Sequence, residues 1–327
     1  MLAWQMNELG DPWDKLTLAE IPAPRPGPGT VHIRVEATDV NFADILQCQG
    51  GYQVRLDPPF TPGMTAGGVV IAAGDGTDFK TGDRVVGHTL DVYGGYAQES
   101  ILEAEFTYKV PEDVPLEAAS GIHITHATSW FALYHRGRLQ PGETLLVLAA
   151  AGGVGSSAVQ MAKAHGCRVI AAAGGSEKTA FCRELGADEV IDYRDEDLYA
   201  RVMDLTDGRG VDVVYDPVGG EYFDIARRLV AWEGRLLVVG FASGTIPSAP
   251  ANHALVKNYD IVGVHMGGYR GRDNALLRTC YQDLHEQIAS GKVTPIITEQ
   301  AGLNELPQTL KKLANRETLG RLLFVPG

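Results

Sequence analysis

The feature of the sequence with the clearest chemical meaning is a glycine-rich turn near its middle. An apolar segment, Thr144–Leu148, leads into a turn of sequence AAAGGVG, and an amphipathic helical pattern follows over Ser156–His165. This is an A-x-G-x-x-G form of the dinucleotide-binding fingerprint. In it, Gly152 lets the backbone approach a pyrophosphate and Gly155 lets helix and strand pack closely, with Ala150 in place of the usual first glycine. The helix N-terminus favours the negative charge. The site is predicted to consist of Gly152, Gly153, Val154 and Gly155.

The choice between NADPH and NADH depends on the end of the next predicted strand, Arg168–Ala173. An NAD site places Asp or Glu there to bind the ribose hydroxyls, whereas this chain has Ala173 followed by GGSEK. These residues leave room and offer backbone, hydroxyl and ammonium donors for a 2′-phosphate. The sequence therefore predicts NADPH. The residues expected to hold it are Gly174, Ser176, Lys178 and Tyr193, with Arg194 also within reach.

Two alternatives to this interpretation stay open. A glycine turn between a strand and a helix also occurs for structural reasons alone. The second alternative concerns the segment after Ala173. In it, Lys178 is a solvated helix residue, and Glu177 either stabilises the positive end of the helix or serves as a displaced ribose ligand. A kcat/KM with NADH that matches the value with NADPH would favour this second view.

A pair of histidines is the candidate for metal binding in this sequence. His123 and His126 are three residues apart, which puts both imidazoles on one face of a predicted helix. Zinc takes about four ligands, usually including carboxylate or thiolate groups, and the neighbouring sequence supplies none. We therefore expect no metal site, and ordinary helix packing for both histidines.

The elements that position the glycine turn follow an alternating pattern of strand and helix. Apolar strand-like segments recur from about Pro141 onward, separated by helix-length segments or loops, which predicts a doubly wound parallel sheet. The six predicted strands are Thr144–Leu148, Arg168–Ala173, Val190–Asp192, Val211–Tyr215, Arg235–Val239 and Asp260–Val264.

The first third of the chain has a different texture. Short alternating segments such as Val31–Glu36, Val69–Ala73 and Arg84–Val86 lie between Pro- and Gly-rich turns, which predicts a β-barrel or partial barrel. From about Asn274 the pattern predicts a helix, an extended piece at Val293–Ile297, a second helix and a final strand at Leu322–Val325. With 327 residues the chain is longer than a single hydrophobic core usually supports, so we expect two domains. The C-terminal segment is expected to fold with the N-terminal domain.

Composition and charge exclude several classes of protein. A formal charge of −13 argues against a protein that tracks the phosphates of a nucleic acid. No apolar run reaches the ~18 residues expected of a membrane span, and the N-terminus does not resemble a signal peptide. The four cysteines form no C-x-x-C pair, as expected of a reduced thiol set. We expect a cytoplasmic protein that binds a small-molecule substrate, without nucleic-acid or membrane partners.

Several short motifs together resemble the zinc-independent quinone oxidoreductases of the medium-chain dehydrogenase/reductase superfamily. The resemblance covers the whole chain. The motifs that carry it are NFAD at 41–44, GY at 51–52, PGMTAG at 62–67, GDRV at 82–85, GGYA at 94–97, GGVG at 152–155, DPVGG at 216–220, VGFASGTIPS at 239–248 and KN at 257–258.

This resemblance implies an α/β protein with a GroES-like β-barrel substrate domain and a Rossmann domain. The implied boundaries are 1–121 with 266–327 for the discontinuous substrate domain, and 122–265 for the NADPH-binding domain. Homodimers joined through the cofactor domains are also implied. Where zinc-dependent relatives place a cysteine ligand, this chain has Asn41, and where they have Gly-His-Glu it has Gly63, Met64 and Thr65.

The resemblance also assigns roles to individual residues. Asn41 and Tyr52 are implied to donate hydrogen bonds to the oxygen on which negative charge develops. Thr128 is implied to contact the nicotinamide, and Trp130 to shape the substrate pocket. The residues implied to line the nicotinamide ring are Val239, Gly240 and Phe241. Three of these residues also have a structural interpretation, in which Asn41 braces a loop and Tyr52 and Trp130 belong to a core.

Without a metal to polarise a carbonyl, the expected reaction is hydride transfer from the nicotinamide to an electrophilic acceptor, such as a quinone, an enone or an enal. Alignment of donor and acceptor and hydrogen bonds to the developing negative charge are then the protein's contribution. Two alternatives are an enoyl-CoA reductase of the acryloyl-CoA type, and a cofactor-binding protein without significant turnover.

Overall fold

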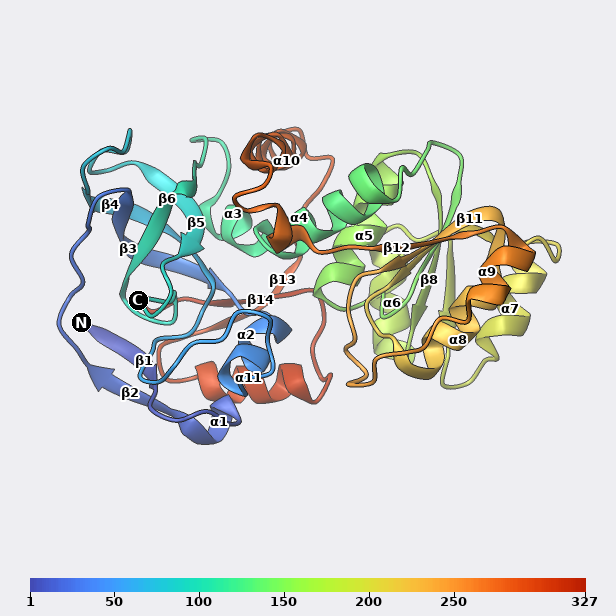
Figure 1. Cartoon of the computed structure of the whole chain (residues 1–327), viewed down its shortest axis with the longest axis horizontal. Helices are drawn as coiled ribbons and strands as arrows, with labels where there is room; N and C mark the ends of the chain where they lie inside the picture. The colour runs from blue at the N-terminus through green and yellow to red at the C-terminus, as the bar shows by residue number, and fades with distance from the viewer. The chain divides into compact units, whose positions relative to one another are not determined.

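The computed structural model describes all residues from 1 to 327, and the chain divides into two compact units. The first unit comprises 1–124 and 273–327, and the second comprises 125–272. The family resemblance implied boundaries at 121/122 and 265/266. Figure 1 shows the order of the elements along the chain. Because the first unit is discontinuous, the C-terminal segment folds with the N-terminal one.

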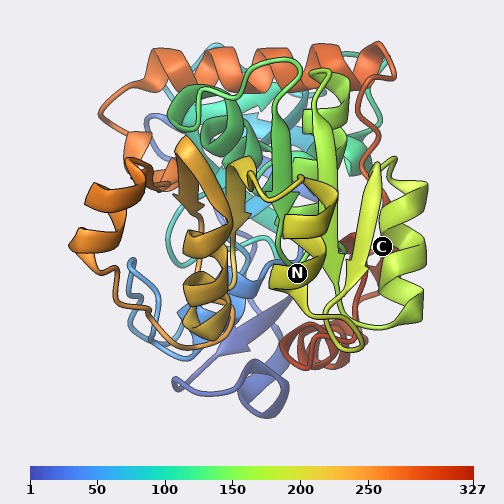
Figure 2. The same cartoon turned by 90° about the vertical axis from the view of Figure 1, so that its right-hand side faces the viewer.

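The second unit is built on a six-stranded parallel sheet with the strand order β12-β11-β10-β7-β8-β9. Helix α5 packs on β7 and β8, and helix α8 packs on β10 and β11. Figure 2 shows this unit facing the viewer, with helices beside the sheet. Its strands are β7 (Thr144–Val147), β8 (Arg168–Ala173), β9 (Glu189–Asp192), β10 (Val211–Asp216), β11 (Val230–Val238) and β12 (Asp260–Gly263). Its helices are α4 (Thr125–Trp130), η1 (Phe131–Arg136), α5 (Gly153–Ala164), α6 (Ser176–Glu184), α7 (Leu198–Leu205), α8 (Gly220–Leu229), α9 (Ala251–Lys257) and η2 (Met266–Tyr269).

Burial on both faces explains why these strands are apolar runs rather than alternating segments. All four residues of β7 are buried, as are five of the six in β8 and β10. The core on one face gathers large apolar side chains from strands and helices, among them Leu146, Ile170, Val214, Phe223 and Leu236. The strands after β7 are added on one side of it as β8 and β9, and then on its other side as β10, β11 and β12. The loop after β7 therefore lies at the topological switch point, where such sheets bind ligands.

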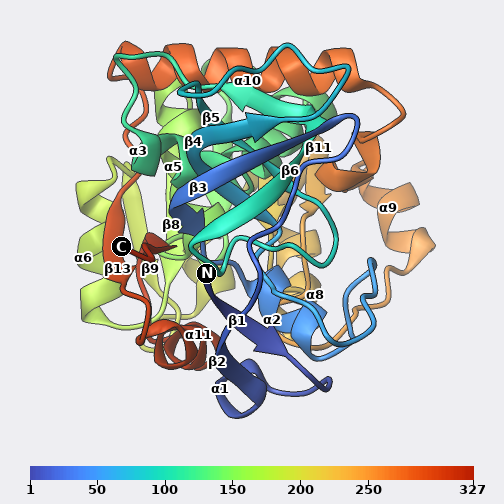
Figure 3. The same cartoon turned by 90° about the vertical axis from the view of Figure 1, so that its left-hand side faces the viewer.

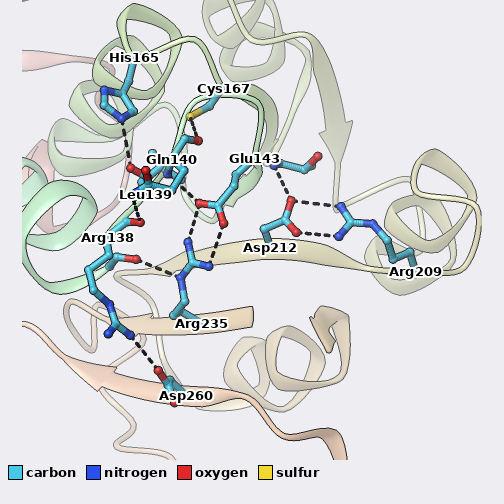
Figure 4. A network of polar contacts seen from close by, with 12 residues as sticks. Arg138, Leu139, Gln140, Glu143, His165, Cys167, Arg209, Asp212, Arg235 and Asp260 are labelled. Atoms are coloured by element: carbon cyan, nitrogen blue, oxygen red, sulfur yellow. Dashed lines mark hydrogen bonds and ion pairs between the residues drawn. The ribbon is translucent and has the colours of Figure 1, made fainter. Parts of the chain in front are cut away.

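A network of charged side chains braces the opposite, amino-terminal edge of this sheet (Figure 4). The guanidinium of Arg235 donates to both carboxylate oxygens of Glu143, at 2.9 and 2.6 Å. Asp212 accepts from the Thr144 amide at 2.8 Å and from Arg209 at 2.6 and 3.1 Å. These bonds tie the starts of β7 and β10 to Arg235 in the middle of β11, at the opposite end of β7 from the glycine turn.

The first unit contains a sheet with the order β13-β14-β3-β4-β5-β6, and β3 also pairs with β6. The four strands β3, β4, β5 and β6 therefore pair in a closed ring. Figure 3 turns these strands toward the viewer. A separate hairpin joins β1 and β2. The strands are β1 (Leu2–Met6), β2 (Leu16–Glu20), β3 (Thr30–Asp39), β4 (Thr65–Ala73), β5 (Arg84–Thr89), β6 (Glu99–Lys109), β13 (Ile297–Ala301) and β14 (Arg321–Phe324). The helices are α1 (Pro12–Lys15), α2 (Phe42–Cys48), α3 (Leu116–Ile122), α10 (Asn274–Ala289) and α11 (Leu306–Ala314).

Most of the strand predictions are confirmed, and two local predictions are wrong. The extended piece predicted at Val293–Ile297 is instead the strand Ile297–Ala301. His123 and His126 do not share a helix, because α3 ends at Ile122 and α4 begins at Thr125. The His123 ring stacks on Tyr281 with centroids 4.3 Å apart, and burial lowers the pKa of His126 to about 3.

Candidate functional site

The glycine turn after β7 has the geometry of a phosphate-binding loop. Ala149 adopts a positive φ of 48°, and the Gly152 amide donates to the Ala149 carbonyl at 3.0 Å. The helix α5 then starts at Gly153, and no side chain caps its first turn. Because the first amides of a helix have no partner within it, they are available to an anion at this end.

The two glycines of the fingerprint, Gly152 and Gly155, have different surroundings. A Cβ atom on Gly155 would overlap the carbonyl oxygen of Ala149 and lie 2.8 Å from the Cα of Ala150. Gly155 is therefore required by the packing of α5 on the turn. A Cβ on Gly152 would meet nothing closer than the Ala149 oxygen at 3.4 Å, an ordinary contact. No atom of the protein fills the space beside Gly152, so the backbone there is open to a ligand.

The loop after β8 brings together the residues predicted to select the cofactor. A Cβ on Gly174 would lie 2.8 Å from the Tyr193 ring and 3.0 Å from Nε of Arg194, so both side chains lie against this glycine. Gly175 has a φ of 95°, a conformation that favours glycine, and precedes the first residue of α6, Ser176. Tyr193 and Arg194 therefore share one surface with the Gly-Gly turn.

The Asp192 carboxylate fixes the conformation of the loop after β8. Asp192, the last residue of β9, accepts the Gly175 amide at 2.9 and 3.0 Å and the Arg194 amide at 3.0 Å. The donation from the Gly175 amide is the main reason that the pKa of Asp192 is lowered. Because this carboxylate is engaged by backbone amides, it is not free to bind a ribose. Ser176 and Lys178 lie at the start of α6, with Glu177 between them. Ser176 is exposed and Lys178 half-buried.

The third cofactor segment, Val239–Phe241, follows β11. The Val239 amide donates to the Asp216 carbonyl at 2.9 Å, and a Cβ on Gly240 would lie 3.3 Å from the Pro217 oxygen. These contacts hold the loop close to the end of β10. Phe241 remains partly exposed, at 40%.

Thr128 and Trp130 lie on α4 within the same unit. Thr128 is half-buried, whereas Trp130 is buried and packs edge-on against Phe131, with ring centroids 5.2 Å apart. The neighbouring Ser129 hydroxyl lies 2.7 Å from Ser157 Oγ and 2.9 Å from the Tyr215 hydroxyl. This buried hydroxyl cluster fixes α4 against α5 and β10, and the sequence motifs did not single it out.

In the first unit, Asn41 is the N-cap of α2 and is almost fully buried. Its amide donates to Asp44 Oδ2 at 2.8 Å, which is the backbone half of a capping box. Asp44 also accepts from the Met64 amide at 3.1 Å and the Tyr96 hydroxyl at 2.9 Å. Burial raises the pKa of Asp44 to about 6, although the three hydrogen bonds oppose this shift. Tyr52 is half-buried in the loop that follows α2.

One partner of the Asn41 side chain is Arg321, a residue that sequence analysis missed. The Oδ1 atom of Asn41 accepts a hydrogen bond from Nη2 of Arg321 at 3.1 Å, and the two residues are 280 positions apart in the chain. Arg321 is the first residue of β14 and also forms an ion pair with Asp39. The signal available in the sequence was an arginine directly before the apolar residues of a buried strand.

The residues present fit a dinucleotide cofactor. The open backbone at Gly152, the uncapped start of α5 and the Gly174 turn match the pyrophosphate and the adenosine side of such a cofactor. No three His, Cys, Asp or Glu side chains gather as they would around a metal ion. No helix combines the length and hydrophobicity that crossing a lipid bilayer requires. The fold and site thus define a two-unit Rossmann protein of the medium-chain dehydrogenase type.

Comparisons with known proteins place the chain within this class. Residues 27–112 match the family model "Alcohol dehydrogenase GroES-like domain", and residues 153–282 match "Zinc-binding dehydrogenase". Quinone oxidoreductase-like protein 2 of Bos taurus is 39% identical over 312 residues, covering 94% of this chain and 88% of the relative. The chain belongs to the zinc-independent quinone oxidoreductase family of the medium-chain dehydrogenase/reductase superfamily.

Solved structures agree with this assignment. The quinone oxidoreductase of Escherichia coli, solved in complex with NADPH, superposes with a TM-score of 0.91 at 27% identity, covering all of both chains. A mycobacterial protein, Rv1454c, also solved with NADPH, gives a TM-score of 0.91 at 30% identity over all of both chains.

Proposed function

We propose that this protein is an NADPH-dependent oxidoreductase that reduces quinones or activated alkenes such as enones and enals, by hydride transfer without a metal. When bound, NADPH supplies a hydride at C4 of its nicotinamide. The observation that carries the proposal is the open backbone at Gly152 beside the uncapped start of α5. Both relatives solved with NADPH share this fold over their whole length.

Three groups of residues hold the cofactor in this proposal. Gly152 lets the backbone approach the pyrophosphate, and the amides of Gly153, Val154 and Gly155 in the first turn of α5 bind it. Gly174, Ser176, Lys178 and Tyr193 hold the 2′-phosphate, with Arg194 beside them, because cations and hydroxyls replace the acid of an NAD site. Thr128 and the segment Val239–Phe241 contact the nicotinamide.

On the substrate side, Asn41 and Tyr52 donate hydrogen bonds to the acceptor oxygen as negative charge develops on it. Each such donor in an enzyme contributes on the order of 3 kcal/mol to the transition state. Trp130 shapes the substrate pocket. The names of the relatives, quinone oxidoreductase and quinone oxidoreductase-like protein, support quinones as acceptors.

A panel of acceptors tests this function directly. NADPH oxidation is followed with quinones, enals, enones and short enoyl-CoA esters, each with a chelator present and with Asn41→Ala as a matched variant. We expect turnover with quinones or enones that survives the chelator and falls at least tenfold in the variant. Turnover with enoyl-CoA esters alone would instead identify an enoyl-CoA reductase. NADPH binding without any acceptor-dependent oxidation would identify a binding protein.

We also propose a cytoplasmic homodimer joined through the cofactor units. The four cysteines are all unpaired and buried, as expected in a reducing compartment. The strand β12 lies at an edge of the sheet. Four exposed apolar side chains lie in β12, in α9 and in the loop before α9, and such side chains favour an interface. They are Ile246, Leu255, Val256 and Ile261. Sedimentation of the wild type and of Leu255→Glu tests this: the wild type should be a dimer and the variant a monomer.

A further inference from the structure

A buried arginine lies beside the proposed oxyanion donor. Arg321 is 4% exposed and all four residues of its strand, β14, are buried. Its Nε donates to the Gly121 carbonyl at 3.0 Å, and its Nη2 donates to Asn41 Oδ1 at 3.1 Å. The same nitrogen forms an ion pair with Asp39 Oδ1. One guanidinium thus joins β3, the end of α3 and the start of α2.

This arrangement is costly to keep. Asp39 is 1% exposed, and its second oxygen, Oδ2, has no hydrogen-bond partner. Burial lowers the pKa of Arg321 to about 9. Buried ion pairs often stabilise a protein no more than well-packed apolar side chains of similar volume would. Stability alone therefore gives a weak reason for an arginine and an aspartate here.

The contact decides what the Asn41 side chain offers to its surroundings. A guanidinium carries donors and no acceptor, so the carboxamide must turn its oxygen toward Arg321. The NH2 group then faces the other way. One of its hydrogens makes a long bond to the Asp39 carbonyl, 3.3 Å between Nδ2 and O, and the second has no partner in the structure. Rotation of the amide by half a turn would place donors against donors and is disfavoured.

We infer that Arg321, held by Asp39, is a positioning residue that fixes the Asn41 carboxamide with its NH2 group available to the acceptor oxygen. This inference rests on the proposed function, because it assigns a purpose to the donor role of Asn41. A donor that is already oriented needs no rearrangement when charge develops, which is the basis of electrostatic preorganisation. The guanidinium acts through Asn41 and does not itself contact the substrate.

The test replaces the ion pair without leaving an unpaired charge. The double variant Asp39→Leu, Arg321→Met removes both charged groups and fills similar volume, so we expect a melting temperature close to that of the wild type. We expect kcat with the best acceptor to fall at least tenfold, while the NADPH dissociation constant stays within twofold. Adding Asn41→Ala to the double variant should lower kcat no further than Asn41→Ala alone, since both changes remove one function.

A control and a second variant keep the test decisive if the double variant is unstable. Arg235→Met breaks another arginine–carboxylate pair, with Glu143, in the second unit. It should lower stability without changing kcat at a temperature where it is folded. Arg321→Lys keeps the charge opposite Asp39 but loses the branched fork. We expect it to fold and to have a kcat between those of the wild type and the double variant.

A readout without turnover comes from the Asn41 side-chain amide in ¹⁵N NMR spectra, assigned by its loss in Asn41→Ala. We expect two separate proton signals that exchange slowly in the wild type and rapidly in the double variant. A double variant with wild-type kcat, beside an Asn41→Ala variant that has lost activity, would overturn the positioning role. Wild-type kcat in Asn41→Ala would overturn the donor role of Asn41 and this inference with it, whereas acceptor reduction in the panel would still stand.

Discussion

The two glycines of the fingerprint predict opposite effects of one substitution. Alanine at position 155 would place its Cβ 2.8 Å from the Ala150 Cα and 2.9 Å from the Ala149 carbonyl carbon, closer than real Cβ contacts. Because the obstacle is backbone, the turn or α5 must shift, and overpacking of this kind costs about 2–3 kcal/mol. For a unit of this size we expect the melting temperature to fall by roughly 4–12 °C.

Alanine at position 152 should behave differently. Its Cβ would make only an ordinary contact, 3.4 Å from the Ala149 oxygen, and the backbone there is extended, with φ of −82°. The loss of a glycine N-cap costs up to about 1 kcal/mol. The methyl group would, however, stand where the pyrophosphate approaches. We expect the NADPH dissociation constant to rise at least tenfold, which corresponds to about 1.4 kcal/mol.

Differential scanning calorimetry without cofactor and titration of NADPH fluorescence measure the two effects separately. Gly27→Ala is a suitable control, because no atom lies within 4 Å of a Cβ at that position and its φ is not in the left-handed region. An NADPH affinity of wild-type strength in Gly152→Ala would refute the reasoning, since the backbone at this glycine would then not be the approach surface.

Three further predictions concern specificity, stability and pH. Lys178→Ala combined with Arg194→Ala should raise KM for NADPH at least tenfold and leave KM for NADH within about twofold, measured by steady-state kinetics. Arg235→Met should lower the free energy of unfolding in urea by about 2 kcal/mol, because Glu143 loses a bidentate partner; an unchanged value would show that the network does not brace the sheet. Burial lowers the pKa of His285 to about 4, so the folded state binds fewer protons than the unfolded state below about pH 6.5 and stability is lost as pH falls toward 4. Urea unfolding of His285→Leu at neutral pH and near pH 4 should show this loss reduced by about 3 kcal/mol; an unreduced loss would rule out this histidine as its source.

Local sequence predicted the second unit well, because a parallel sheet buried on both faces leaves continuous apolar runs between glycine turns. The strand Arg168–Ala173 matches β8 at both ends for this reason. The His123–His126 interpretation was wrong because spacing alone does not show where a helix ends, and here two short helices meet between Ile122 and Thr125. Tertiary packing overrides such short-range signals.

The Arg321 contact with Asn41 lies beyond what local patterns reveal. Its partners Asp39 and Asn41 stand at the end of one strand and the start of a helix, and Arg321 opens the last strand of the chain. Pairing of β14 with β3 brings them together, with Leu323 opposite Asp39. No periodicity or motif encodes a contact that depends on sheet topology between the two termini of the chain.

The choice of NADPH is tested most directly by kcat/KM for NADPH and for NADH, measured with the same quinone or enone. The loop at Gly174, with Lys178 and Arg194 near it and Asp192 engaged by backbone amides, predicts a kcat/KM at least tenfold higher with NADPH. A value with NADH that equals or exceeds the value with NADPH would contradict this account of the site.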